Sequence, residues 1–321
     1  MGSDHGHAGH SHGVTADADR RYLVIALSLI VAFMLAEVVV GLVANSLALL
    51  ADAGHMTSDA AALGLGILAI NLAARPAVGA YTFGLRRAEI LSAQANGITL
   101  LGLAIFFIVV AIRRLVHPPD VHGGLVLVVA LVGVAVNLAA TLVLLRANRE
   151  SMNIEGSFQH ILTDLYAFVA TVIAGAIIMT TGFTRADPIA SLFVAGLMVK
   201  AGYGLLRDSW RIFLEAAPRG LNPDQIEQDM RQVGGILDIY DFHVWEVTSG
   251  FPALSAHVLV EDGCDCHERR LRLEQLLVDR YRIDHATLQV DHPHNVSPAQ
   301  RHAAEAHKGR GLHVHSHDHE H

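Results

Sequence analysis

Six long apolar segments restrict what this sequence can fold into. They cover residues 22–43, 47–74, 90–112, 125–145, 158–181 and 188–206. An α-helix that rises about 1.5 Å per residue needs about 20 predominantly apolar residues to cross the roughly 30 Å hydrocarbon core of a bilayer. Each segment is close to this length. The sequence therefore predicts a multi-pass α-helical membrane protein with six transmembrane helices.

The composition agrees with a membrane location. Charged residues make up 17% of the chain and hydrophobic residues 52%, whereas soluble domains contain about 25% charged residues. Aromatic residues account for only 6%, and glycine is frequent, which suits closely packed helices better than a membrane β-barrel. The net charge of -8 gives no indication of a nucleic-acid partner, and none is expected.

Basic residues indicate the orientation of the helices. An even number of spans places both termini on one side of the membrane, and cytoplasmic loops carry an excess of Lys and Arg. Three arginines flank helix ends on the far side, Arg113, Arg114 and Arg185. The terminal side has Arg20, Arg21, Arg75, Arg86, Arg87, Arg146, Arg149, Arg207 and Arg211. We therefore expect both termini in the cytoplasm and the protein in the inner (plasma) membrane.

Composition divides the chain into four regions. A transmembrane domain at residues 20–215 and a cytoplasmic domain at residues 216–294 lie between two tails, residues 1–19 and 295–321. The tails contain histidines interspersed with small and polar residues, which predicts disordered, metal-binding segments. A purification tag is the alternative for this His-rich texture.

The cytoplasmic region predicts a small α+β domain. Asn222 followed by Pro223 is a helix-start signal. Helical patterns cover residues 223–233 and 266–281, whereas β-branched and aromatic residues indicate strands at 238–248, 253–261 and 285–291. The expected order of elements is therefore αββαβ.

Two pairs of ionisable residues interrupt the apolar segments. His55 and Asp59 lie in the second segment, and His160 and Asp164 repeat the same spacing in the fifth. Residues four apart share one face of a helix, and a charged residue at the centre of a membrane helix costs about 2.5 to 3.5 kcal/mol, so such residues are usually functional. Two imidazoles and two carboxylates match a tetrahedral zinc site. Local hydrogen bonds that help the helices associate are the alternative.

The two pairs can meet only if they lie at the same depth. Because His160 lies near the start of its apolar segment, we expect the fifth helix to begin earlier, near Ser151 or Asn153. Glu37, Asp52, Asn96 and Asn137 are further polar residues inside the spans. They predict either a wetted path for ions or hydrogen bonds between helices.

These residues resemble the cation diffusion facilitator family of metal/proton antiporters, in particular its zinc-transporting branch. The most specific stretch runs from Ser46 to Asp59, and the second is the pair of His160 and Asp164. The similarity covers residues 22–293 and includes residues 187–188, 243–245, 255–257 and 283–289.

The resemblance implies a homodimer of six-helix subunits whose transport site consists of His55, Asp59, His160 and Asp164. It also implies a cytoplasmic ferredoxin-like domain that dimerises and binds regulatory Zn²⁺. The implied ligands in that domain are His243, His257, His285 and Asp291, with Cys264 or Cys266 as a further candidate. Exposed strand histidines without a metal are the alternative.

The loop between the second and third helices departs from the family pattern at one position. Leu85 stands where some members have a metal-binding histidine, so no metal site is expected in this loop. In the same comparison, Arg87 and Glu215 occupy the positions of a charge interlock near the membrane exit of a dimer.

The expected function is export of Zn²⁺ from the cytoplasm in exchange for protons, by alternating access around the four membrane ligands. Cd²⁺, Co²⁺ and Ni²⁺ are alternative cargoes, because such ligands bind several of these ions. A zinc-binding sensor or scaffold without transport is one alternative function. A membrane metalloenzyme is another, although four protein ligands leave no position for a catalytic water and the sequence contains no H-E-x-x-H motif.

Overall fold

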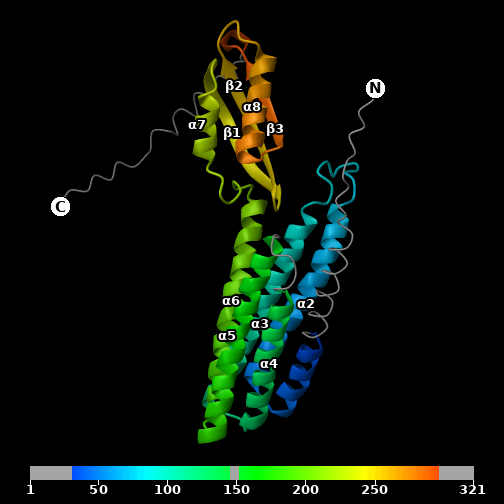
Figure 1. The fold of residues 1–321 in the computed structure, drawn as a ribbon, viewed down its shortest axis with the longest axis vertical. Coiled ribbons are helices and arrows are strands. Elements are labelled where there is room, and N and C mark those ends of the chain that lie inside the picture. Colours follow the sequence, from blue (N-terminus) through cyan, green and yellow to red (C-terminus); the bar gives the residue numbers. More distant parts are fainter. Residues whose placement is uncertain (1–30, 145–151, 296–321) are drawn as a thin grey trace, which may run out of the picture. The chain divides into compact units, whose positions relative to one another are not determined.

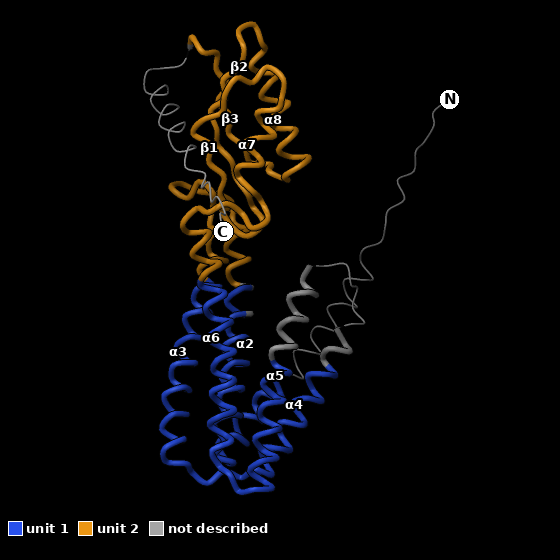
Figure 2. Tube along the Cα trace, turned by 90° about the vertical axis from the view of Figure 1, so that its left-hand side faces the viewer, with its two compact units in different colours: residues 1–67, 92–206 blue, residues 68–91, 207–321 orange. Residues whose placement is uncertain are grey.

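The computed structural model describes residues 31–144 and 152–295, which belong to two compact units. The first unit contains residues 1–67 and 92–206, and the second contains residues 68–91 and 207–321 (Figure 2). The side chains of residues 140–163, which include His160, lie outside this description. The two His-rich tails lie outside it as well.

Helices account for the first unit, and Figure 1 shows α2 to α6 running side by side. The elements are a helical segment at Val31–Val43, α2 at Leu47–Ala73, α3 at Ala88–Val116, α4 at Gly123–Leu144, α5 at Met152–Thr181 and α6 at Ala186–Phe213. The start of α5 at Met152 agrees with the expectation that this helix extends beyond its apolar segment.

Several of these helices have the length and apolar character of membrane spans. Within the described residues there are four such spans: α2, α3, α6 and the part of α5 from Asp164 to Thr181. The segments Val31–Val43 and Gly123–Ala139 are shorter apolar helices. A membrane helical domain is therefore confirmed, whereas the number of six spans stays a prediction, because residues 22–30 of the first segment fall outside the described chain.

Glycines permit close approach of the helices. A Cβ atom added to Gly202 on α6 would lie 2.9 Å from the carbonyl oxygen of Gly97 on α3. A Cβ atom on Gly175 of α5 would lie 2.7 Å from the backbone nitrogen of Leu127 on α4. Real Cβ atoms do not come this close, so small residues at these positions determine how α3 packs on α6 and α4 on α5.

A buried carboxylate on α6 caps the first turn of α2. Asp187, which is fully buried, accepts hydrogen bonds from the Ser46 hydroxyl at 2.5 Å and from the Leu47 backbone N–H at 2.7 Å. Arg114 donates to the Asn45 carbonyl at 2.7 Å and lies 4.0 Å from Asp187. Arg114 runs against the overall distribution of basic residues, and these contacts give it a structural role at the turn between the first two helices.

The second unit contains a three-stranded mixed sheet with two helices. Its elements are α7 at Pro223–Arg231, β1 at Ile236–Thr248, β2 at Phe251–Val260, α8 at Cys266–Tyr281, β3 at His285–Asp291 and a 3₁₀ turn at Pro293–Asn295. Strand β2 is central, antiparallel to β1 and parallel to β3. The element order agrees with the predicted αββαβ.

Both helices cover the same face of this sheet. Ile226 and Met230 of α7 and Leu273 and Leu277 of α8 share one core with alternate residues of β2, from Leu254 to Val260. Because side chains alternate along a strand, Ser255 and His257 belong to the opposite face. That face, which neither helix covers, contains the histidines expected to bind metal.

Candidate metal centre

The His55 side chain lies between two carboxylates within the helical unit. Its Nδ1 is 3.6 Å from an Asp59 oxygen one turn further along α2, and its Nε2 is 3.7 Å from an Asp164 oxygen on α5. His55 is 3% exposed. Both separations are longer than a typical N–H···O hydrogen bond. The Nε2–Asp164 separation is close to the roughly 3.3 Å between two light-atom ligands that lie about 2.0 to 2.1 Å from one tetrahedral metal. Because an imidazole binds a metal ion through one nitrogen, Asp59, which faces the other nitrogen, must reorient to bind the same ion.

Two of the other predicted membrane ligands, Asp59 and Asp164, each have a carboxylate oxygen within 3.7 Å of a His55 ring nitrogen. His160 lies on α5, one helical turn before Asp164, but its side chain is outside the described part of the chain. Among the side chains that are described, no three His, Cys, Asp or Glu residues converge closely enough to hold a metal ion. His160 is thus the fourth ligand only by prediction, from its spacing to Asp164.

Two further carboxyl groups lie in the same part of the helical unit. Glu37 and Asp52 are buried, with 0% and 1% exposure. Glu37 interacts electrostatically with Asp52 and Asp164, and Asp52 also with Asp59. Acidic residues are costly in an apolar helix, so the presence of Glu37 and Asp52 in the sequence indicated that they have a function. Their grouping around His55 depends on the packing of the helices.

Asn96 has a different role from these carboxyl groups. Its side-chain oxygen accepts a hydrogen bond from the Ser58 hydroxyl at 2.9 Å, which links α2 to α3. This contact favours the helix-packing interpretation over the wetted path for this residue.

A smaller cluster lies on the uncovered face of the sheet in the second unit. Nε2 of His243 is 3.1 Å from one oxygen of Asp241, and Nε2 of His257 is 3.8 Å from the other. Asp241 was not predicted as a site residue. It lies where the β1–β2 register shifts and has a left-handed φ of 51°. Such a bulge redirects a side chain, and the sequence alone gave no signal for it.

One of the other predicted cytoplasmic ligands, His285, lies apart from this cluster. In the parallel pairing of β2 with β3, His257 is opposite Gln289, His285 is opposite Ala253 and Asp291 is opposite Leu259. His285 is therefore four strand positions, or about 13 Å, from the level of His257. Its ring instead contacts those of Phe83 and Phe251, each at 5.7 Å between centroids. The predicted set of four does not converge within one chain.

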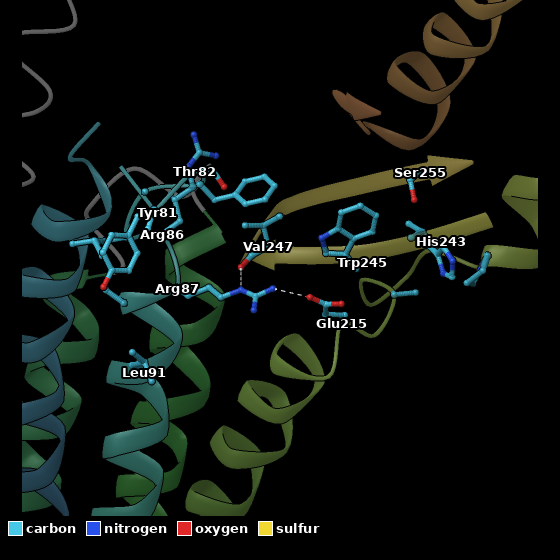
Figure 3. Close-up of a pocket in the computed structure, with 18 of the residues that line it drawn as sticks. Tyr81, Thr82, Arg86, Arg87, Leu91, Glu215, His243, Trp245, Val247 and Ser255 are labelled. Carbon is cyan, nitrogen blue, oxygen red and sulfur yellow. Dashed lines mark hydrogen bonds and ion pairs between the residues drawn. The ribbon is translucent and has the colours of Figure 1, made fainter. Parts of the chain in front are cut away.

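A cleft of about 1060 Å³ in the second unit includes the loop before α3 and the edge of β1 (Figure 3). Arg87 lines this cleft, 3.4 Å from a Glu215 oxygen and 3.2 Å from the Val247 carbonyl to which its Nε donates. Arg87 and Glu215 thus pair within one chain, and the interlock in a dimer stays a prediction. His243 lines the same cleft beside Trp245.

Comparison with known proteins identifies both parts of the chain. Residues 23–214 match the cation efflux transmembrane domain, and residues 218–293 match the cytoplasmic domain of cation efflux proteins. A cadmium, cobalt and zinc/H⁺–K⁺ antiporter of Bacillus velezensis is 34% identical over 88% of this chain and 92% of its own length. The zinc transporter ZitB of Escherichia coli is 36% identical over 90% of this chain and 92% of its own length.

Among solved structures, the metal-bound C-terminal domain of the CzcD transporter from Cupriavidus metallidurans is 28% identical, with a TM-score of 0.21. The match covers 22% of this chain and 99% of that domain. The family matches confirm the resemblance to the zinc-transporting branch of the cation diffusion facilitators and exclude the enzyme alternative, because the matched family consists of transporters. With both of its domains matched between residues 23 and 293, this chain belongs to the cation efflux family of membrane transporters.

Proposed function

We propose that this protein exports Zn²⁺ from the cytoplasm in exchange for protons, through a tetrahedral site of His55, Asp59, His160 and Asp164. The observation that carries the proposal is the position of the His55 ring between carboxylates of α2 and α5. Ligands from two different helices allow a metal to be held or released when those helices move relative to each other. This arrangement supports alternating access around one central site.

Charge balance supports a dication as the cargo. Two ionised carboxylates neutralise the charge of Zn²⁺, which is otherwise very costly to hold in a medium of low dielectric constant. Imidazole nitrogen and carboxylate oxygen are both ordinary zinc ligands. Cd²⁺, Co²⁺ and Ni²⁺ bind similar sets, and the named cargoes of the Bacillus velezensis relative and of ZitB favour zinc together with cadmium and cobalt.

The same groups provide the exchange with protons. A protonated imidazole has two N–H donors, and each nitrogen of His55 faces one carboxylate. Protonation of His55 therefore supplies a positive charge between Asp59 and Asp164 when no metal is bound. Metal ligands must lose their protons to bind, so Zn²⁺ and protons compete for the site and their movements are coupled.

The remaining features of the proposal concern topology and assembly. We place six spans in the inner membrane with both termini in the cytoplasm, and the boundaries of the domains at residues 20–215 and 216–294. The cytoplasmic domain is proposed to be ferredoxin-like, to dimerise and to bind regulatory Zn²⁺. Within it, Asp241, His243 and His257 are the ligands that the geometry favours.

Transport measurements in proteoliposomes test the proposal. With an imposed pH gradient, we expect Zn²⁺ to move against its own gradient while the pH gradient collapses. The same assay is carried out with Cd²⁺, Co²⁺ and Ni²⁺. His55→Asp is expected to change the order of metals, because it replaces a nitrogen ligand by an oxygen. A sensor or scaffold would bind Zn²⁺ without moving it. Transport by a variant with alanine at all four ligands would show that the proposed site is wrong.

A further inference from the structure

A cysteine and two histidines meet at one end of the cytoplasmic sheet, away from the cluster around Asp241. Cys266 is the first residue of α8, while His292 and His294 follow the end of β3. The Cys266 Sγ lies 3.3 Å from Nε2 of His292. The rings of His292 and His294 are stacked, with 5.6 Å between centroids and 7° between planes.

The distance between Sγ and Nε2 fits two ligands of one metal ion. A zinc ion binds thiolate sulfur at about 2.3 Å and imidazole nitrogen at about 2.0 to 2.1 Å in a tetrahedral shell, which places the two ligand atoms about 3.5 Å apart. The observed separation corresponds to an angle at the metal of about 100° for these bond lengths. The His292 ring and the Cys266 thiol can therefore bind the same ion without moving far.

His294 is the candidate for a third ligand. Its Nδ1 lies 3.1 Å from a carboxylate oxygen of Asp262. Metal-binding histidines characteristically donate one ring N–H to a carboxylate, which leaves the other nitrogen available for the metal. The His294 side chain is 65% exposed, so its Nε2 can turn towards Cys266 and His292 at little cost.

We propose that Cys266, His292 and His294 form a binding site for a thiophilic divalent metal such as Zn²⁺ or Cd²⁺, with Asp262 orienting His294. Three protein ligands leave the fourth position to water or to another side chain. Because this site is separate from the membrane ligands, it gives the cytoplasmic domain a means of binding metal that does not depend on transport. The described side chains do not converge closely enough to hold an ion, so metal binding requires the rotation of His294.

The two cysteines of the chain make the proposal specific. Cys264, the only other cysteine, packs against the domain core, and its Sγ lies 2.9 Å from the position of a Cβ added to Gly235. Cys264→Ser is therefore a matched control for Cys266→Ser. The His-rich tails contain no cysteine, so they cannot contribute a signal that depends on a metal–sulfur bond.

The experiment is a titration of the full-length protein in detergent micelles with Cd²⁺ and with Co²⁺, followed by thiolate-to-metal charge-transfer absorption. We expect the band in the unmodified chain and in Cys264→Ser, and its loss in Cys266→Ser. His292→Gln keeps the thiol and is expected to weaken binding at least about tenfold, as is Asp262→Asn. The band is also expected in Asp59→Ala, so that a failure of this site and a failure of the transport site can be told apart.

Three results would overturn the proposal. They are an absence of the band in the unmodified chain, its persistence in Cys266→Ser, and its loss in Cys264→Ser with Cys266 intact. Size-exclusion chromatography shows whether Cys266→Ser folds. If it does not, His292→Gln decides the question, and an unchanged midpoint of the metal titration in that variant counts against the site.

Discussion

His55 on α2 and Asp164 on α5 lie 3.7 Å apart, Nε2 to Oδ1, although the chain passes through α3 and α4 between them. The two residues thus connect helices that are distant in sequence at the position of the predicted metal. Burial of both side chains, with exposures of 4% and 16%, keeps this contact largely away from water.

Asp164→Asn removes one of the two negative charges at this site and nearly preserves its shape. We expect Zn²⁺ transport in proteoliposomes to fall at least about tenfold in this variant, because a neutral amide binds the dication more weakly than a carboxylate. A tenfold loss corresponds to about 1.4 kcal/mol of binding free energy. Ser58→Ala is the control, since it removes only a helix-to-helix hydrogen bond worth about 0.6 kcal/mol. Equal transport by both variants would refute a ligand role for Asp164.

Asp187→Asn tests the cap on α2. This change removes the negative charge of the carboxylate that accepts hydrogen bonds from the Ser46 hydroxyl and the Leu47 N–H. The amide keeps one acceptor oxygen and replaces the other by an NH₂ group, so one buried donor loses its acceptor, which typically costs about 1 to 3 kcal/mol. Thermal unfolding in micelles measures it, with Asp120→Asn, an exposed carboxylate on the same side of the helices, as the control. A shift no larger than that of the control would contradict the role of the cap.

Gly202→Ala tests the close contact between α3 and α6. The added methyl would lie 2.9 Å from the Gly97 carbonyl oxygen, so the helices must separate or strain, at a cost of about 1 to 3 kcal/mol. Gly196→Ala on the same helix is the matched control, because nothing lies within 4 Å of its Cβ position. We expect a lower unfolding temperature for the first variant only. Equal stability of the two variants would show that the contact does not limit the packing.

Asp229 predicts a pH dependence of the cytoplasmic domain. The Tyr281 hydroxyl donates to its carboxylate, and the pKa of Asp229 is lowered mainly by this hydrogen bond. A carboxylate with a lowered folded-state pKa stabilises the domain above its unfolded pKa of about 3.9, and this contribution is lost as the pH falls through the folded value. Tyr281→Phe and Asp229→Asn should each reduce the difference in stability between pH 7 and acid conditions.

Tryptophan fluorescence is a suitable measurement for this last prediction. The chain has two tryptophans, and Trp245 lies in β1 of the domain in question. A Trp210→Phe background therefore isolates its signal. An acid-dependent loss of stability that is the same with and without Tyr281→Phe would assign the effect to other groups.

Local sequence patterns determined the helices and strands of this protein. Apolar runs of membrane length, the helix signal at Asn222 and Pro223, and the alternation of β-branched residues depend on neighbours within a few positions, so they are readable without a fold. The spacing of His55 to Asp59 and of His160 to Asp164 is local as well. The high cost of ionisable groups in an apolar helix made those four residues the natural ligands.

Contacts between distant segments were decided only by the tertiary structure. Packing of the helices groups Glu37 and Asp52 near His55 and places Asp187 over the start of α2. An irregularity in strand pairing turns Asp241 towards His243. The contact of Cys266 with His292 depends on where α8 begins relative to the end of β3. Each of these results from register and packing, which bring together residues with no shared pattern in the sequence.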